Sequence, residues 1–193
     1  MIALQYLISV IVFALFILSV ITRAVTLRRQ GIRAMMFGET DKTDFILMPF
    51  VFAVIYVVLA NTFGWPVWDV LVYRFWASDI PGWVGLVFGI AALVFFIYTL
   101  VSFGISFRVG IDEDNPAELV TTGAFAISRN PIYVCFLAFF FGLFLVHSNI
   151  VITLAFVAFA LVIHRQIIRE EKFLVSYYGE KFEEYCSRVR RYL

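Results

Sequence analysis

Leu119-Val-Thr-Thr-Gly-Ala-Phe-Ala-Ile-Ser-Arg-Asn-Pro-Ile-Tyr133 is a polar, turn-rich stretch between hydrophobic runs long enough to cross a bilayer. A second charged cluster, from Arg165 to Glu171, lies at the end of the last hydrophobic run. Polar groups held at a membrane face are costly, so they usually mark a functional site. These two segments are therefore the candidate site, and the runs around them determine the fold.

Apolar residues make up 63% of the 193 residues, which is well above the content of a soluble domain. The sequence predicts an all-α membrane protein that forms one domain over residues 1–193, with about five transmembrane helices. The five apolar runs are Ile2–Ile21, Phe45–Phe63, Gly82–Phe107, Pro131–His147 and Ile150–Ile168. Only Ser148 and Asn149 separate the last two runs, which requires a tight helical hairpin.

The distribution of Lys and Arg predicts the orientation. The connection after the first run holds five of them, the next holds only Arg74, the third holds two, the Ser148–Asn149 turn holds none, and the tail from Arg165 holds seven. Under the positive-inside rule, the N-terminus lies outside and the C-terminus and site are cytoplasmic. All four tryptophans flank the connection that holds Arg74, as expected of an outer aromatic belt. We expect a multi-pass protein of a bacterial inner membrane or the endoplasmic reticulum, with a retained first helix because no basic residue precedes it.

Two further patterns predict packing. Gly85 and Gly89 form a GxxxG spacing, which favours close helix packing inside the monomer. After Ile168, apolar residues recur at helical spacing and predict an amphipathic helical tail, broken near Gly179, that lies on the inner membrane face or on the loop. This stripe comprises Leu174, Tyr178, Phe182, Tyr185, Val189 and Leu193.

Several classes of function are disfavoured. The net charge of +1 does not support nucleic-acid binding, and the two cysteines are too far apart to indicate a disulfide framework. The sequence has no P-loop, HExxH, CxxC or GxSxG motif. His147 and His164 lie on opposite sides of the predicted bilayer, so we expect no metal.

The charged cluster displays both signs of charge at the membrane boundary. Gln166 and Glu170 are one helical turn apart, as are Arg165 and Arg169. This arrangement suits a zwitterionic cofactor such as S-adenosylmethionine together with an apolar acceptor. The alternative is an interfacial anchor with surface ion pairs, each of which contributes little.

The order and spacing of these residues resemble the isoprenylcysteine carboxyl methyltransferase and phospholipid methyltransferase families of integral membrane enzymes. The resemblance covers roughly residues 105–192, with a helical hairpin between its two halves. The matching positions are Leu119-Val120, Gly123, Phe125, Arg129-Asn130-Pro131-Ile132-Tyr133, Glu170-Glu171, Leu174, Tyr178-Gly179, Phe182 and Tyr185.

The resemblance implies an S-adenosylmethionine-dependent methyltransferase with a three-helix part at 1–104 and a catalytic part at 105–193. A cytosolic loop and C-terminal amphipathic helices would form the cofactor site, and a lipid-like or prenylated acceptor would enter from the membrane lipids. Arg165 and Arg169 would orient an anionic acceptor, and Glu170 would complete the catalytic set. The residues assigned to cofactor binding are Ala117, Glu118, Leu119, Val120, Gly123, Phe125, Arg129, Asn130, Pro131, Ile132, Tyr133, Glu170 and Glu171.

Departures from the isoprenylcysteine pattern leave the acceptor open. Asn130 stands where those enzymes usually have His, Phe125 where they have Tyr, and Gln166 where they have a substrate-binding Arg. Carboxyl O-methylation of the isoprenylcysteine type is favoured, with phospholipid N-methylation as the alternative. Two more functions stay open. The first is an NADPH-dependent reaction like that of the sterol reductases, which typically have Asn where this chain has Ile132. The second is that of a non-catalytic membrane scaffold.

Overall fold

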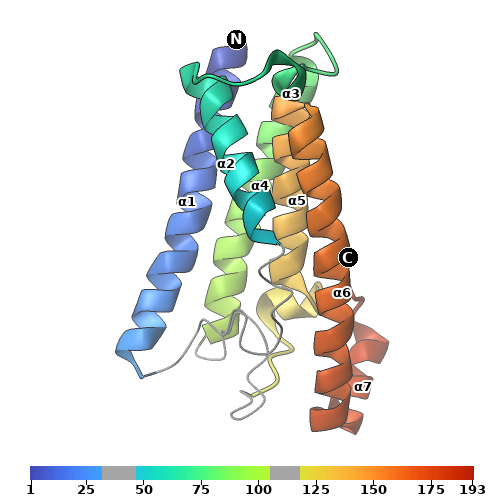
Figure 1. Ribbon diagram of the computed structural model, residues 1–193. Helices are drawn as coiled ribbons and strands as arrows, with labels where there is room; N and C mark the ends of the chain where they lie inside the picture. The colour runs from blue at the N-terminus through green and yellow to red at the C-terminus, as the bar shows by residue number, and fades with distance from the viewer. Residues whose placement is uncertain (32–46, 105–117) are drawn as a thin grey trace.

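Five long apolar helices run alternately up and down one bundle (Figure 1). The structure, a computed structural model, describes residues 1–31, 47–104 and 118–193, and every regular element in these ranges is helical. The long helices are α1 (Ile2–Arg29), α2 (Leu47–Phe63), α4 (Ile80–Phe103), α5 (Pro131–His147) and α6 (Ile150–Tyr178). The shorter elements are α3 (Asp69–Val72), the 3-10 helix η3 (Gly123–Ala126) and α7 (Glu180–Arg188). The predicted all-α membrane fold is confirmed.

The helix lengths agree with the predicted crossings. α1, α4 and α6, with 28, 24 and 29 residues, are long and apolar enough to cross a membrane. α2 and α5 are equally apolar but have 17 residues each. At a rise of 1.5 Å per residue, such a helix is about 26 Å long, near the lower limit for a hydrocarbon core of about 30 Å.

Local sequence explains where α5 and α6 begin. Pro131 is the first residue of α5, where its missing N–H removes no helical hydrogen bond. Ser148 ends α5 in the left-handed region, with φ of 40°. The Asn149 side-chain oxygen then accepts a hydrogen bond from the Ile152 amide and caps α6. The predicted tight hairpin is confirmed, and it places the start of α5 beside the middle of α6.

Several helices do not end where the apolar runs end, and α1, for example, continues past Ile21 to Arg29. The third apolar run reaches Phe107, but α4 ends at Phe103, where Gly104 has a φ of +54°. The predicted division between residues 104 and 105 falls at this break in the described chain and stays a prediction. The charged cluster does not end the last membrane helix, because α6 continues to Tyr178. Charge ends an apolar run without ending a helix, since Arg, Glu and Lys are good helix formers. α6 stops at the predicted break, Gly179, whose φ is +55°.

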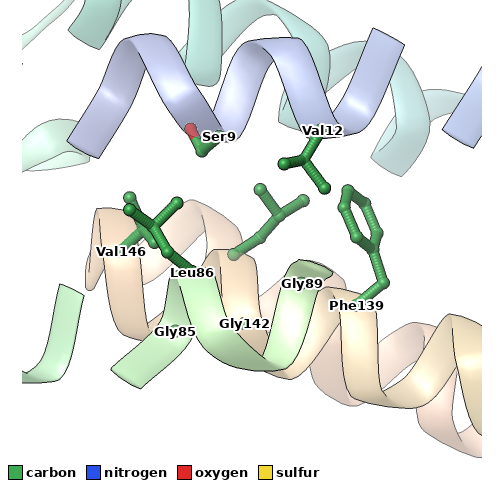
Figure 2. Close-up of a pocket in the computed structure, with 9 residues that line it drawn as sticks. Ser9, Val12, Gly85, Leu86, Gly89, Phe139, Gly142 and Val146 are labelled. Atoms are coloured by element: carbon green, nitrogen blue, oxygen red, sulfur yellow. The ribbon is translucent and has the colours of Figure 1, made fainter. Parts of the chain in front are cut away.

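Glycines hold α4 and α5 together. A Cβ atom on Gly85 would lie 2.5 Å from the Gly142 carbonyl oxygen, and one on Gly142 would lie 2.6 Å from the Gly85 carbonyl oxygen. The predicted packing role of the GxxxG spacing inside the monomer is therefore confirmed, with Gly142 of α5 as its partner. Figure 2 shows the small pocket at this contact, which Ser9 and Val12 of α1 face from across the bundle.

The rest of the core combines aliphatic side chains with stacked phenylalanines. Phe16 of α1 stacks on Phe96 of α4, with ring centroids 4.4 Å apart, and Phe140 of α5 stacks on Phe159 of α6 at 4.1 Å. Leu, Ile, Val and Phe side chains remain exposed along the outer faces of the long helices. In a bilayer these faces meet lipid, so their exposure is expected.

The two ends of the bundle differ in chemistry. The N-terminus, α3 and the α5–α6 turn lie at one end, and η3 and α7 lie at the other (Figure 1). At the first end, His147 is fully buried between the Ser9 hydroxyl at 3.0 Å and the Asn61 amide at 3.1 Å. At the second end, the Arg23 guanidinium of α1 donates to the Gly104 carbonyl after α4. The site described next lies at this second end.

Candidate active site

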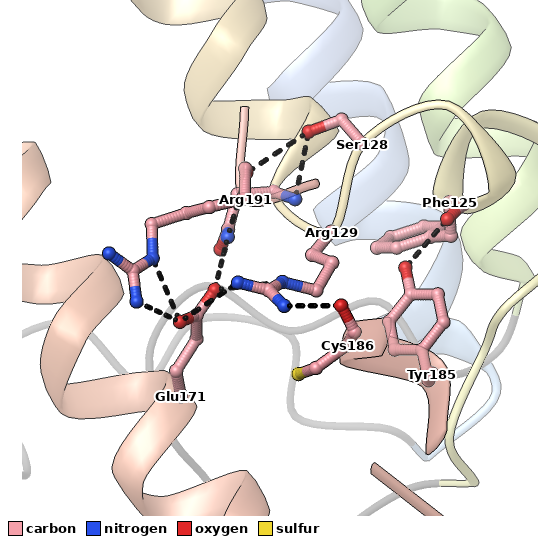
Figure 3. Close-up of polar contacts among 8 residues, drawn as sticks. Phe125, Ser128, Arg129, Glu171, Tyr185, Cys186 and Arg191 are labelled. Carbon is pink, nitrogen blue, oxygen red and sulfur yellow. Dashed lines mark hydrogen bonds and ion pairs between the residues drawn. The ribbon is translucent and has the colours of Figure 1, made fainter. Parts of the chain in front are cut away.

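A buried carboxylate on α6 joins three parts of the chain. Glu171 is 8% exposed, and its oxygens face side chains from the loop before α5 and from the tail after α7 (Figure 3). The Arg191 guanidinium contacts Oε2 through Nε at 2.9 Å and through its terminal nitrogen at 2.8 Å. The Arg129 Nε lies 3.2 Å from Oε1, and the Asn130 amide donates to Oε1 at 3.1 Å. Two guanidinium groups and an amide thus converge on one carboxylate.

The neighbouring carboxylate faces a different set of side chains. The Tyr133 hydroxyl donates to Glu170 Oε1 at 2.5 Å, and the Gln166 amide donates to the same oxygen at 3.0 Å. Gln166 and Glu170 lie one turn apart on α6, so their predicted common face is confirmed. Because Tyr133 lies in the first turn of α5, this contact joins the two helices of the hairpin directly.

The tail after α7 docks on the loop before α5 through its backbone. The Arg129 amide donates to the Arg190 carbonyl at 3.0 Å. The Arg191 carbonyl accepts from the Asn130 side chain at 3.1 Å and from the Ser128 hydroxyl at 3.3 Å. An amide group has two N–H donors, so Asn130 uses one on Glu171 and the other on this carbonyl.

An apolar cluster lies beneath these polar contacts. Phe125 of η3 packs with Phe182 and Tyr185 of α7, and the Tyr185 hydroxyl donates to the Phe125 carbonyl at 2.6 Å. Of the two positions predicted for the amphipathic tail, the membrane face and the loop, the structure shows contact with the loop. Leu193 departs from the stripe, because it is 66% exposed. The partly buried members of the cluster are Phe103, Leu119, Val120, Leu174, Tyr178, Cys186 and Val189.

The surroundings of the tail change its ionisation. Burial raises the pKa of the Tyr185 phenol, although the nearby Arg129 charge opposes this shift. Burial likewise raises the pKa of the Cys186 thiol. The hydrogen bond to Glu171 raises the pKa of the Arg191 guanidinium. All three groups therefore keep their protons at neutral pH.

The structure brings most of the predicted site residues to one end of the hairpin. Arg129 and Asn130 contact Glu171, and Tyr133 contacts Glu170, the preceding residue. Pro131 is buried at the start of α5, and Ile132 packs on the main core. The contacts bring the two predicted segments together, while the roles of these residues toward a cofactor stay predictions.

Other predicted residues lie at the edge of this constellation. Gly123 has a φ of +62°, and a Cβ there would lie 2.4 Å from the Ser102 hydroxyl of α4. Glu118 is exposed, and Ala117 lies outside the described residues. Arg165 is exposed on α6, whereas Arg169 is partly buried one turn later.

Sequence reasoning did not identify Arg191, Ser128 or Tyr192. The Tyr192 hydroxyl lies 2.6 Å from His164 Nδ1 on α6. Charges in the tail resemble an ordinary solvated face, so the sequence contains no local signal that singles out Arg191. Its partner Glu171 is 20 residues away, on the preceding helix.

The bundle and this polar site define a class, that of all-α membrane proteins with a site at one end of a helical hairpin. The sequence model of the phospholipid methyltransferase family matches residues 78–181, more than half of the chain. The chain belongs to this family. The match spans α4, η3, the hairpin and the start of α7, and so includes Arg129, Asn130, Tyr133 and both glutamates of the site.

Curated relatives carry names from the isoprenylcysteine branch. Two rice proteins (Oryza sativa subsp. indica and subsp. japonica), each named a probable protein-S-isoprenylcysteine O-methyltransferase, are 34% identical over 113 residues. These alignments cover 55% of this chain and 58% of each rice protein. The protein-S-isoprenylcysteine O-methyltransferase of Schizosaccharomyces pombe is 37% identical over 75 residues, which are 37% of this chain and 30% of that protein. The chain thus spans little more than half the length of the rice relatives.

Proposed function

We propose that this protein is an S-adenosylmethionine-dependent methyltransferase that methylates the carboxylate of an isoprenylcysteine-type, lipid-like acceptor at the membrane face. One observation carries the proposal. The Arg-Asn-Pro-Ile-Tyr segment at the start of α5 meets the Glu170–Glu171 pair across the hairpin, with the Tyr133 hydroxyl 2.5 Å from Glu170. Family membership and the names of the relatives support the same reaction.

The residues at this end fit the proposed cofactor. Glu170 supplies a partly buried carboxylate for the ammonium group, and Tyr133 and Gln166 hold that carboxylate in place. Backbone amides near Leu119 and Val120, beside the apolar Phe125 cluster, can meet the cofactor's polar and flat parts. When bound, the cofactor supplies an electrophilic methyl group on a sulfonium.

The remaining chemistry is mostly positioning. A carboxylate is ionised at neutral pH, so the acceptor needs no general base. Arg165 and Arg169, on the turn of α6 before Glu170, are the cations that we assign to its orientation. Holding nucleophile and methyl group about 3–3.5 Å apart can contribute about 7–11 kcal/mol to catalysis.

The fold also supports the route of the acceptor. The site lies at the end of the bundle, and the helix faces leading to it carry exposed apolar side chains. A hydrocarbon chain can lie along these faces in the cytoplasmic leaflet while its carboxylate turns toward the arginines. This arrangement agrees with the cytoplasmic site that the basic connections predict.

Phospholipid N-methylation is the second candidate. Gln166 occupies the position of the substrate-binding arginine of the isoprenylcysteine enzymes and donates to Glu170, so this position supplies no cation for an anionic acceptor. A protonated amine acceptor must lose a proton before it attacks. Glu171 is engaged by two guanidinium groups, so Glu170 is the carboxylate that we would assign to this step.

A direct assay separates these candidates. The purified protein in detergent is incubated with deuterated-methyl S-adenosylmethionine and either a farnesylated cysteine with a free carboxylate or phosphatidylethanolamine, and products are identified by mass spectrometry. We expect label only on the farnesylated acid, and none on its methyl ester, which is the matched control. Label on phosphatidylethanolamine alone would replace the first proposal by the second. No label on either acceptor, together with no binding of the cofactor by calorimetry, would refute both.

A further inference from the structure

Arg191 makes a contact that is unusual for a tail residue. It follows α7 and lies outside any helix, yet its guanidinium meets the buried Glu171 through two nitrogens at 2.9 and 2.8 Å. Both nitrogens contact the same oxygen, Oε2, and hydrogen bonds between charged groups are stronger than those between neutral groups. The surface pair of Arg188 and Glu184, a few residues earlier, lies at 3.5 Å with side chains that are 65% and 72% exposed.

The same segment holds the loop before α5 by its backbone. The Arg190 and Arg191 carbonyls accept from the Arg129 amide, the Asn130 side chain and the Ser128 hydroxyl. The loop segment 128–130 is therefore held from two sides, by the Glu171 carboxylate on α6 and by the tail backbone. Arg191 joins both sides, because its side chain reaches Glu171 while its carbonyl meets the loop.

We propose that Arg191 is a positioning residue whose ion pair with Glu171 clamps the C-terminal tail onto Arg129 and Asn130 and so assembles the cofactor-binding wall. This inference rests on the proposed function, and it assigns Glu171 to the clamp and Glu170 to the cofactor. Without the clamp, Arg129 and Asn130 keep Glu171 but lose the tail carbonyls that hold them from the other side. Tyr133 follows them in the next turn of α5, so its contact with Glu170 loosens as well.

A cysteine inside the clamp reports whether it is closed. The Cys186 carbonyl accepts from the Arg129 guanidinium at 3.3 Å, and the thiol is half-buried in the apolar cluster. Burial raises its pKa, so its reaction with a maleimide is slow while the tail is docked. Cys135 is fully buried in α5 and reacts only if the bundle itself opens, so it is an internal control for folding.

The experiment compares Arg191→Ala with Arg188→Ala, which removes the same charge from the exposed pair. Labelling of each cysteine is followed by mass spectrometry in detergent. We expect Cys186 to react at least about tenfold faster in Arg191→Ala than in wild type, to keep its wild-type rate in Arg188→Ala, and to be intermediate in Arg191→Lys, which retains the charge but loses the planar fork. Equal Cys186 rates in Arg191→Ala and Arg188→Ala would overturn the clamp. Labelling of Cys135 in Arg191→Ala would mean that the bundle of this variant has opened. In that case Arg191→Lys, instead of Arg191→Ala, is compared with Arg188→Ala.

The second measurement is the dissociation constant of S-adenosylmethionine by calorimetry on the same variants. We expect Arg191→Ala to weaken binding about tenfold to a hundredfold, as for the loss of a charged hydrogen bond, with Arg188→Ala unchanged. Faster Cys186 labelling with wild-type affinity would overturn the positioning role. A wild-type protein that binds no S-adenosylmethionine would refute the proposed function, and the labelling rates would still support or overturn the clamp.

Discussion

Adjacent glutamates on α6 have different surroundings, and the difference follows from helix geometry. Successive residues on an α-helix point about 100° apart, so Glu170 and Glu171 cannot share one set of partners. Glu170 faces Tyr133 and Gln166, whereas Glu171 faces Arg129, Asn130 and Arg191. A pair that looks uniform in the sequence is thus divided into a candidate ligand for the cofactor and a clamp.

Replacing Glu170 tests the first of these roles. We expect Glu170→Gln to weaken S-adenosylmethionine binding about tenfold to a hundredfold, because a hydrogen bond to a charged group contributes about 1.5–3 kcal/mol. Calorimetry in detergent measures the effect. Glu183→Gln, on the exposed side of α7, is the charge-matched control and should bind as wild type does. Unchanged affinity in folded Glu170→Gln would remove this residue from the cofactor site.

Replacing Glu171 tests the second role through stability. Glu171→Ala leaves two guanidinium groups without their shared carboxylate, and breaking a buried pair costs about 3–5 kcal/mol. The Arg191 side chain is 38% exposed, so water replaces part of the lost contact. We therefore expect the free energy of unfolding to fall by an amount near the lower end of this range, about 3 kcal/mol. Denaturant unfolding of both proteins in detergent, with and without the cofactor, measures the difference in free energy of unfolding between wild type and Glu171→Ala. A variant as stable as wild type would show that the contacts of Glu171 with Arg129 and Arg191 do not stabilise the fold.

At the scale of elements, the close contact between α4 and α5 depends on glycine. Gly142 of α5 packs against the backbone of Gly85 and Gly89 of α4, and backbone atoms cannot move aside as a flexible side chain can. This contact sets the position of α5, whose first turn carries the polar segment of the site. Helix packing and the site are therefore coupled through one helix.

Gly142→Ala tests this coupling. Its Cβ would lie 2.6 Å from the Gly85 carbonyl oxygen, so we expect overpacking to lower the free energy of unfolding by about 1–3 kcal/mol and to lower the thermal midpoint in detergent. Gly89→Ala is the control, since its Cβ would meet Val12 at an ordinary 3.7 Å. Equal midpoints for the two variants would show that the α4–α5 contact has room to adjust.

At the scale of the whole molecule, the basic residues and the tryptophans predict the orientation in the membrane. Ala77, in the connection before α4, and Ser187, on α7, are exposed at opposite ends of the bundle. In a background with both cysteines changed to alanine, we expect Ala77→Cys to react with an impermeant maleimide from the outer side. Ser187→Cys should react only from the cytoplasmic side. Sealed membrane vesicles of known orientation provide the test, and the reverse pattern would invert the topology.

Lateral entry of the acceptor makes a prediction about chain length. If the hydrocarbon lies along the bundle, each methylene that loses burial should lower kcat/KM by a factor that corresponds to at most about 0.8 kcal/mol. A series of S-alkylcysteine acceptors of decreasing length measures this dependence. Short, water-soluble acceptors that react as efficiently as long ones would show that the site opens to the cytosol instead.

The sequence by itself determined the features that depend on neighbours along the chain. Apolar runs long enough to cross a bilayer identified the five helices, the short Ser148–Asn149 connection predicted the hairpin of α5 and α6, and Gly179 marked where α6 ends. The Gln166–Glu170 pair followed from the helical repeat. The meeting of Arg129 and Tyr133 with the glutamate pair followed from the short turn, since a tight hairpin keeps α6 adjacent to α5 along the whole length of α5.

Only the tertiary structure decided how the two glutamates divide their partners and what the tail does. Arg191 reaches Glu171 because α7 folds back at Gly179 and packs Phe182 and Tyr185 on Phe125, which brings the segment after α7 to the start of α5. The sequence likewise did not show that the last membrane helix and the predicted amphipathic helix up to Gly179 form one continuous helix, because a change from apolar to charged residues marks the membrane boundary and leaves the backbone helical. Contacts between distant segments depend on how whole elements pack, and no local pattern of residues encodes them.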